Sequence, residues 1–485
     1  MTEAATAEPG TVGLNRGLAL LVAGTFFMEN LDGTIVATAA PAIAADLGVR
    51  PVDINVVMTA YLVAVAVGIP LSGWLADRFG GRRVFLLAIG VFTVASALCA
   101  VSPNLAVLSA VRVLQGLGGA MMVPVGRLVV LRSTQKRDLL DAIAYLTWPA
   151  LVAPVVAPFL GGWLSTYAGW QWIFLVNIPL GVLAVVVALR VVPVVDGTDV
   201  PPLDWVGFLL CGLTLATLLV GLEQVGGGTT RGVVVAVLLV VAALAGVLTV
   251  RRMRRTRDPL LDLAALEVRT FWVANVSGMV YRMAISAVPF LLPLMFQVAF
   301  GWSAVRAGLL VMAVFLGNVL IKPATSPLIR RFGFRRVIVA SSAGGALTFV
   351  ACAFLRPTTP MVVIAGVLVV SGVMRSVGFS GYNSLMFADI GAAQMSGANT
   401  LSSTIGQLAA GLGVAVAALA LRASDGILGA LVPGHQVLLA YQVTFGLLAL
   451  MMLYPVLEAW LGLHASAGGE VAAGRSPGRP SKSAG

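Results

Sequence analysis

The chain is a succession of apolar runs, each about 20 residues long and separated by short loops. Hydrophobic residues make up 59% of its 485 residues and charged residues only 11%, against about 25% charged residues in an ordinary soluble domain. Burying so much apolar surface inside one fold would leave too little polar material for a water-facing shell. The sequence therefore excludes a soluble globular protein and predicts an all-α integral membrane protein.

About fourteen runs are long enough to cross a bilayer as helices. Their limits are Leu14–Ala40, Asn55–Trp74, Val84–Val101, Leu105–Leu131, Ala142–Leu164, Gln171–Val192, Trp205–Leu222, Gly232–Val250, Thr270–Ala299, Ser303–Leu328, Val337–Leu355, Met361–Phe387, Ala398–Leu421 and Val437–Leu461. The polar segment 1–13 lacks the basic start of a secretory signal, so we expect the first run to remain as a spanning helix.

Lysine and arginine residues are concentrated in alternate loops. About twenty lie in one set of loops and in the C-terminal tail, whereas only about five lie in the opposite set. Because basic loops remain in the cytoplasm, this pattern predicts a multi-pass protein of the cell membrane with both termini cytoplasmic. It also accounts for the net charge of +11 without a nucleic-acid partner.

A repeated loop predicts the architecture. The sequence DRFGGRRV at Asp77–Val84 returns as RRFGFRRV at Arg330–Val337, about 253 residues later. This offset exceeds what six helices usually need, and the runs Trp205–Leu222 and Gly232–Val250 account for the excess. We therefore predict six-helix bundles at 14–195 and 270–461, a two-helix insert with a basic cytoplasmic loop at 196–269, a cytoplasmic N-terminal tail at 1–13 and a disordered cytoplasmic tail at 462–485. Repeated halves around a central site are typical of secondary transporters.

Four segments carry a resemblance to a known family. They are GWLADRFGGRR at Gly73–Arg83, LDGTIVATAAP at Leu31–Pro41, RVLQGLG at Arg112–Gly118 and WQWIFLVNIPLG at Trp170–Gly181. With these segments the chain resembles the major facilitator superfamily and, within it, the fourteen-helix drug:proton antiporters. The resemblance implies a monomeric transporter for multidrug efflux that works by alternating access. It implies a proton gradient as the energy source, no cofactor, and a proton-coupling role for Arg112.

Two further motifs are candidates for conformational gating. In the first loop, an Asp within a basic run favours a specific ion pair that locks one conformer, and the second copy has Arg330 in its place. The loop residues that we assign to gating are Gly73, Asp77, Arg78, Gly80, Arg82 and Arg83. The fifth run departs from the family pattern GPxxGG and reads APFLGG at Ala157–Gly162. Pro154 and Pro158 are expected to kink this helix, and Gly161 and Gly162 to allow close helix approach.

Acidic residues within the spans are the candidates for proton coupling. Glu29 and Asp32 lie three residues apart in the first run and therefore share a helix face. Two neighbouring carboxylates in a low-dielectric cavity bind a proton more readily than one alone. Asp32 lies about 12 Å and Arg112 about 10 Å from the outer ends of their helices, so the two side chains could meet. Proton carriage by these acids and a purely structural ion pair both remain open.

The second half contains buried cations instead. Arg282 and Arg375 are both placed near the bilayer midplane, and the repeat offset aligns Glu29 with Arg282. Either Glu29 and Arg282 form a charge pair across a central cavity, or the arginines form a subsite for an anionic substrate. Lys322 lies nearer a helix end and is expected to snorkel to the interface. We also predict substrate contacts for Gln297, Asn383 and Gln115.

Other functional classes lack the residues they need. There are only two histidines and three dispersed cysteines, which argues against a metal site, and no GxxxxGK[ST] loop for nucleotide hydrolysis. A channel would not explain the repeated halves. The leading hypothesis is a proton-driven exporter of lipophilic drugs. One alternative is an exporter of organic anions or metal–organic-acid chelates. The other is a membrane sensor that transports nothing.

Overall fold

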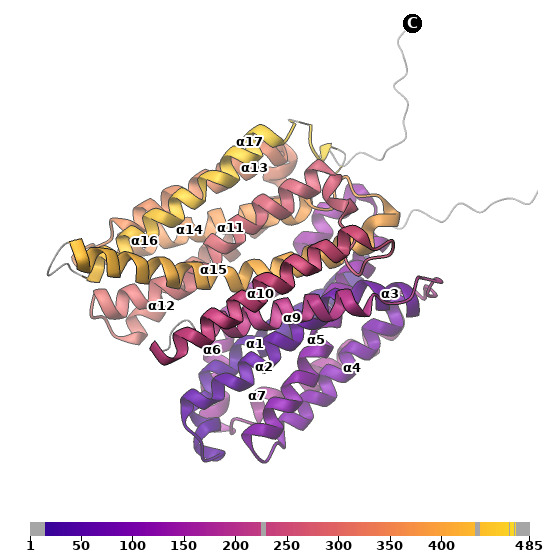
Figure 1. Ribbon diagram of the computed structural model, residues 1–485, viewed down its shortest axis with the longest axis horizontal. Coiled ribbons are helices and arrows are strands. Elements are labelled where there is room, and N and C mark those ends of the chain that lie inside the picture. The colour runs from indigo at the N-terminus through magenta and orange to yellow at the C-terminus, as the bar shows by residue number, and fades with distance from the viewer. Residues whose placement is uncertain (1–14, 225–228, 432–436, 465, 470, 472–485) are drawn as a thin grey trace, which may run out of the picture.

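The computed structural model describes residues 15–224, 229–431, 437–464, 466–469 and 471. Within these residues the chain forms helices and no β-strand (Figure 1). The predicted all-α fold is therefore confirmed. The predicted tail at 1–13 and most of the tail at 462–485 lie outside the described residues.

Seventeen α-helices are found within this part of the chain. The first group comprises α1 (Arg16–Asp46), α2 (Asn55–Gly68), α3 (Ser72–Phe79), α4 (Gly81–Ala100), α5 (Leu105–Ser133), α6 (Leu139–Tyr167), α7 (Trp172–Leu175) and α8 (Asn177–Val191). Next come α9 (Trp205–Glu223) and α10 (Thr229–Arg255). The last group comprises α11 (Arg269–Leu294), α12 (Ala304–Leu320), α13 (Lys322–Ala353), α14 (Met361–Leu385), α15 (Met395–Leu431), α16 (Val437–Met451) and α17 (Leu453–Gly462).

Several membrane spans consist of more than one helix. Within the described residues, twelve helical stretches are long and apolar enough to cross a bilayer, and thirteen when the bent stretch from Lys136 to Tyr167 is counted as one span. Helix α13 is interrupted at Gly333, whose backbone is not helical. Its first part follows α12 directly, and its second part forms a further apolar stretch. These features are compatible with the fourteen predicted spans.

The repeated loop has the same backbone conformation in both copies. Gly80 ends α3 with a φ of 86°, and Gly333 interrupts α13 with a φ of 79°. Both values lie in the left-handed region that glycine adopts without steric cost. The two glycines occupy the same place in the repeated sequence, so the repeat is structural as well as sequential. We call the side of the membrane that carries Gly80 and Gly333 the loop-motif side.

The helix packing follows the same repeat. In the first group α1 packs on α6, α2 on α5 and α4 on α5. In the last group the corresponding contacts are α11 with α15, α12 with α14, and α13 with α14. The first group lies at the indigo and purple side of Figure 1 and the last at the orange and yellow side. The exact division at 195 and 270 stays a prediction.

Of the two helices between these groups, α9 lies against both of them. Helices α9 and α10 pack on each other, and α9 also contacts α2 and α15 (Figure 1). Asp204 caps α9 by accepting from the backbone N–H of Gly207, and it also pairs with Arg252 of α10 at 3.1 Å. Leu209 and Val240 remain mostly exposed, as expected for side chains that face lipid.

Candidate functional site

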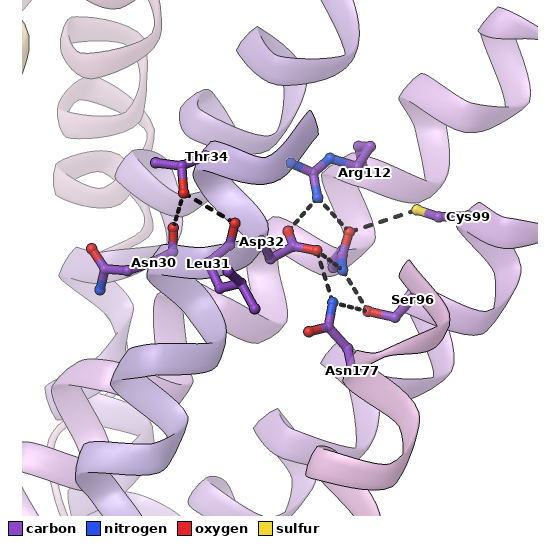
Figure 2. Close-up of polar contacts among 9 residues, drawn as sticks. Asn30, Leu31, Asp32, Thr34, Ser96, Cys99, Arg112 and Asn177 are labelled. Atoms are coloured by element: carbon purple, nitrogen blue, oxygen red, sulfur yellow. Dashed lines mark hydrogen bonds and ion pairs between the residues drawn. The ribbon is translucent and has the colours of Figure 1, made fainter. Parts of the chain in front are cut away.

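The centre of the first helix group contains a buried ion pair. Asp32 of α1 accepts a hydrogen bond from Nη1 of Arg112 of α5, and neither side chain has any exposed surface (Figure 2). The sequence placed these residues at similar depths, and the structure brings them together. A fully buried charge pair is costly to desolvate, so it requires further hydrogen bonds from its surroundings.

Neutral side chains from three more positions supply those bonds. Oδ1 of Asp32 accepts from Nδ2 of Asn177 at 2.9 Å and from Nε2 of Gln115 at 3.0 Å. Both amides also donate to Oγ of Ser96, at 3.2 and 2.6 Å, and Oε1 of Gln115 accepts from Arg112 at 2.7 Å. Figure 2 shows that this network joins α1, α4, α5 and α8. A shift of any of these helices would therefore change the surroundings of Asp32.

Only one nitrogen of the Arg112 guanidinium group, Nη1, donates hydrogen bonds to the network. Its Cζ lies 4.1 Å from the ring centre of Tyr61 on α2 and 5.7 Å from that of Phe174 on α7. Its Nε and Nη2 atoms are buried, and neither has a hydrogen-bond partner in the part of the chain that the structure describes. Unpaired buried donors are costly, so the bond to Asp32 is the main compensation for this cation.

Glu29 is separate from this network. It is partly buried and makes no hydrogen bond or ion pair within the described residues. Its carboxylate lies beside Gly119, as does the Tyr61 hydroxyl, which also makes no hydrogen bond among the described residues. The charge pair between Glu29 and Arg282 that the repeat suggested is not formed. Arg282 instead donates to Oδ1 of Asn383 at 2.9 Å and faces the ring of Phe379.

The predicted substrate residues do not form one site. Arg282 and Asn383 are adjacent, but Arg375 donates to the backbone oxygen of Ile285 at 3.4 Å and lines a small cavity inside the last helix group. Gln297 is exposed and donates to the oxygen of Pro293, four residues earlier in the chain. Gln115 belongs to the Asp32 network. Depth along a helix predicted these positions, but side-chain direction depends on packing that depth does not describe.

Sequence reasoning gave Arg127 of α5 no role, yet it joins the two helix groups. Its Nε donates to Oδ1 of Asn399 on α15 at 2.7 Å, and its Nη2 donates to the Ser403 hydroxyl. Asn399 in turn donates to the oxygen of Pro124 at 2.9 Å. The available signal was an arginine inside an apolar run, which is rare in membrane spans and usually functional.

The loop motif is held by ion pairs, as its mixed charges suggested. Asp77 pairs with Arg132 at the end of α5 at 2.7 Å. The loop arginines bind the end of α8 and the segment that follows it. Arg82 donates to the backbone oxygen of Leu189 in α8, whereas Arg78 pairs with Asp199 and Arg83 with Asp196 beyond the helix.

Other contacts on the loop-motif side join the two helix groups. Gly73 lies against α15, because a Cβ at this position would be 2.3 Å from Oγ1 of Thr400. In the second copy of the motif, Arg330 pairs with Asp141 of α6 at 2.7 Å. Whether these residues gate transport stays a prediction.

In the antiporter-like motif of α6, only one of the two glycines is in close contact. A Cβ on Gly161 would lie 2.1 Å from Oγ1 of Thr38 on α1, whereas one on Gly162 would meet no atom within 4 Å. The helix bends by 50° between the stretch that ends at Pro154 and the stretch that begins at Phe159. The side chain of Pro158 lies outside the described residues.

The expectation that Lys322 reaches the membrane interface was wrong. Its side chain is buried, with 5% of its surface exposed, and its Nζ donates to Oγ of Ser380 on α14 at 2.6 Å. The ammonium group is therefore held against α14 instead of reaching out to the interface. In the described part of the chain, no three His, Cys, Asp or Glu side chains are placed to hold a metal ion.

Comparison with known proteins identifies the family. Residues 22–414 match the model of the Major Facilitator Superfamily. The chain is 37% identical to MdtD of Escherichia coli, a protein named for multidrug resistance, over 83% of this chain and 85% of that protein, and the Shigella flexneri protein of the same name gives the same values.

Two solved structures have a similar fold. The human organic anion transporter MFSD10 (TETRAN) aligns with a TM-score of 0.64 and 16% identity over 93% of this chain and all of the other. The proton:xylose symporter XylE aligns with a TM-score of 0.63 and 12% identity over 93% and 96%. The predicted family and the transporter class are thus confirmed, and the chain is a multi-pass membrane transporter that belongs to the Major Facilitator Superfamily.

Proposed function

We propose that this protein is a proton-coupled antiporter that exports small lipophilic molecules, including drugs, across the cell membrane by alternating access. The similarity to MdtD supports the substrate class. The buried Asp32–Arg112 pair supports the coupling and is the observation that carries the proposal. Both termini would lie in the cytoplasm, and protons and the exported molecule would be the only small partners.

The pair provides a way to link a proton to a conformational change. A proton on Asp32 removes its charge and therefore the ion pair, which leaves Arg112 buried with two further nitrogens already unpaired. Arg112 can regain compensation only if α1 and α5 shift or water enters. Proton binding therefore favours one arrangement of the helices and proton release the other.

The test is substrate-triggered proton flux in proteoliposomes, measured with an internal pH-sensitive dye and a panel of lipophilic cationic dyes. We expect Asp32→Asn to abolish the flux, because its side chain cannot ionise, while dye binding to the protein persists. Asp53→Asn is the matched control. Asp53 is partly exposed, and its hydrogen bond from Arg50 lowers its pKa, so it stays ionised at neutral pH without touching the network. Unchanged coupled export by Asp32→Asn would contradict the proposal.

Organic anions are the second candidate substrate class. Arg127 and Arg282 repel each other electrostatically and are compensated only by neutral groups and aromatic rings. Within the described residues neither pairs with a carboxylate. An anion between the helix groups would relieve this repulsion. If only anionic compounds trigger proton flux, and Arg282→Gln removes that response, the substrate is an anion and the drug assignment fails.

A further inference from the structure

A second cavity lies apart from the Asp32 network, between α6 of the first helix group and α13 of the last. Its volume is about 550 Å³. Its lining includes Arg16, Asp141, Tyr145, Trp148, Lys322 and Arg330. Arg16, Asp141 and Arg330 all lie close to helix ends on the loop-motif side. The cavity therefore extends from that membrane surface toward the interior.

The charges in this cavity are not balanced. Three lining side chains are cationic and one is a carboxylate, and that carboxylate, Asp141, is already paired with Arg330 at 2.7 Å. Lys322 is buried, and its only hydrogen bond within the described residues is to the neutral hydroxyl of Ser380. A buried ammonium group without an anionic partner is costly. The deep end of the cavity therefore favours a negatively charged ligand.

The rest of the lining suits an apolar ligand body. Tyr145 and Trp148 lie one turn apart on α6 and leave 39% and 49% of their surfaces exposed. Lys322 and Arg330 are eight residues apart on α13, which corresponds to about 12 Å along the helix. A molecule of that length would contact aromatic surface along its body and a cation at its leading end.

We propose that this cavity is the site through which an amphiphilic anion enters the transporter from the loop-motif side. Its carboxylate, sulfonate or phosphate group binds Lys322, and its apolar body lies on Trp148 and Tyr145. That the anion enters from the loop-motif side rests on the proposed export function, whereas binding of the anion to this cavity does not. The site lies between the two helix groups, so a ligand there touches both.

The test is binding of a dansyl-labelled undecanoic acid to the purified protein in detergent, followed by fluorescence anisotropy without a proton gradient. The neutral carboxamide of the same compound is the matched ligand. Lys322→Gln keeps a donor for Ser380 but removes the charge, and we expect it to weaken binding of the acid about tenfold and that of the amide little. Arg356→Gln removes an exposed charge on the opposite side and should change neither.

Two more variants distinguish a direct role of Lys322 and Trp148 in binding from a general loss of folding. Ser380→Ala removes the hydrogen bond and leaves the charge, so binding of the acid should weaken less than in Lys322→Gln. Trp148→Leu should weaken binding of acid and amide equally. Equal binding of acid and amide by the native protein, or unaltered binding of the acid by Lys322→Gln, would overturn the site.

Lipid and coupling are tested in separate arms. If phosphatidylglycerol displaces the acid from the native protein while phosphatidylcholine does not, the occupant is a membrane lipid, and the role in substrate access is overturned. Asp32→Asn should bind the acid normally, because the two sites do not share a residue. If the native protein binds the acid but shows no substrate-triggered proton flux, only the antiport proposal is contradicted. If it shows the flux but does not bind the acid, only the proposed entry site is contradicted.

Discussion

At the scale of single residues, the balance of charge decides what each buried group can do. Asp32 has one cationic and two neutral donors, and Arg112 depends on Asp32 for its compensation. Removing one member of a buried ion pair leaves the other uncompensated, which typically costs about 3 to 5 kcal/mol. Removing both is often far less costly. The pair is therefore interdependent in stability as well as in the proposed coupling.

We expect Arg112→Gln alone to destabilise the protein strongly because it leaves the Asp32 carboxylate buried with amide donors only. The double variant Asp32→Asn with Arg112→Gln should recover much of that loss, without recovering proton coupling. Thermal unfolding of the detergent-solubilised variants, followed by helicity, measures the first effect, and proteoliposome flux measures the second. Strictly additive losses of stability would show that the two residues are not coupled.

Sequence alone predicted the ion pair but not its shell. Charged residues inside apolar runs are few, so Asp32 and Arg112 were conspicuous, and their depths follow from the helix rise. Gln115 was predicted to contact the substrate, whereas in the structure it donates to Asp32. The sequence does not show which neighbouring side chain an amide within a span will face. Lys322 was misplaced for the same reason, since the direction of each side chain is fixed by helix packing.

At the scale of elements, close helix contacts depend on which glycine faces the neighbour. The spacing of Gly161 and Gly162 suggested a joint role in close approach. In the structure only Gly161 faces α1, where Thr38 leaves no room for a Cβ, and Gly162 points to open space. The sequence motif thus indicated the contact between α1 and α6, but not which residue makes it.

Alanine at these two positions should have opposite effects. Gly161→Ala is expected to destabilise the protein by about 1 to 3 kcal/mol, because the new methyl group overpacks the contact with α1. Gly162→Ala should be neutral or stabilise it by up to about 1 kcal/mol, because alanine favours the helix more than glycine does. Thermal denaturation in one detergent compares them directly. Equal effects of the two substitutions would show that α1 does not constrain this face of α6.

At the scale of the whole molecule, close contacts between the two helix groups are found on the loop-motif side. Gly73 lies against Thr400, Arg127 binds Asn399, and Arg330 pairs with Asp141. These contacts join the two helix groups on that side. The repeated loop allowed the two groups to be predicted from sequence. The contacts between the groups could not be predicted in this way, because the two residues in each contact do not occupy equivalent positions of the repeat.

Valine in place of Gly73 should force α3 away from α15 and open the loop-motif side. Spin labels at Arg83→Cys and Arg336→Cys, both on exposed positions of the two loop copies, would report the separation by pulsed electron resonance. We expect a larger population of long distances in Gly73→Val than in the parent. Gly90→Val is the control, since a Cβ there meets no atom within 4 Å. Identical distance distributions in all three proteins would rule out a role for Gly73 in closure.

Helix α9 touches α2 in the first helix group and α15 in the last. Thr59 of α2 donates to Glu223 at the end of α9, and Gly411 of α15 lies against Leu219. A helix in contact with both groups must change at least one set of contacts whenever they move apart. The rate at which the two states exchange is therefore expected to depend on side chains of α9 that lie outside the Asp32 network, so turnover could be adjusted at this helix without altering that network.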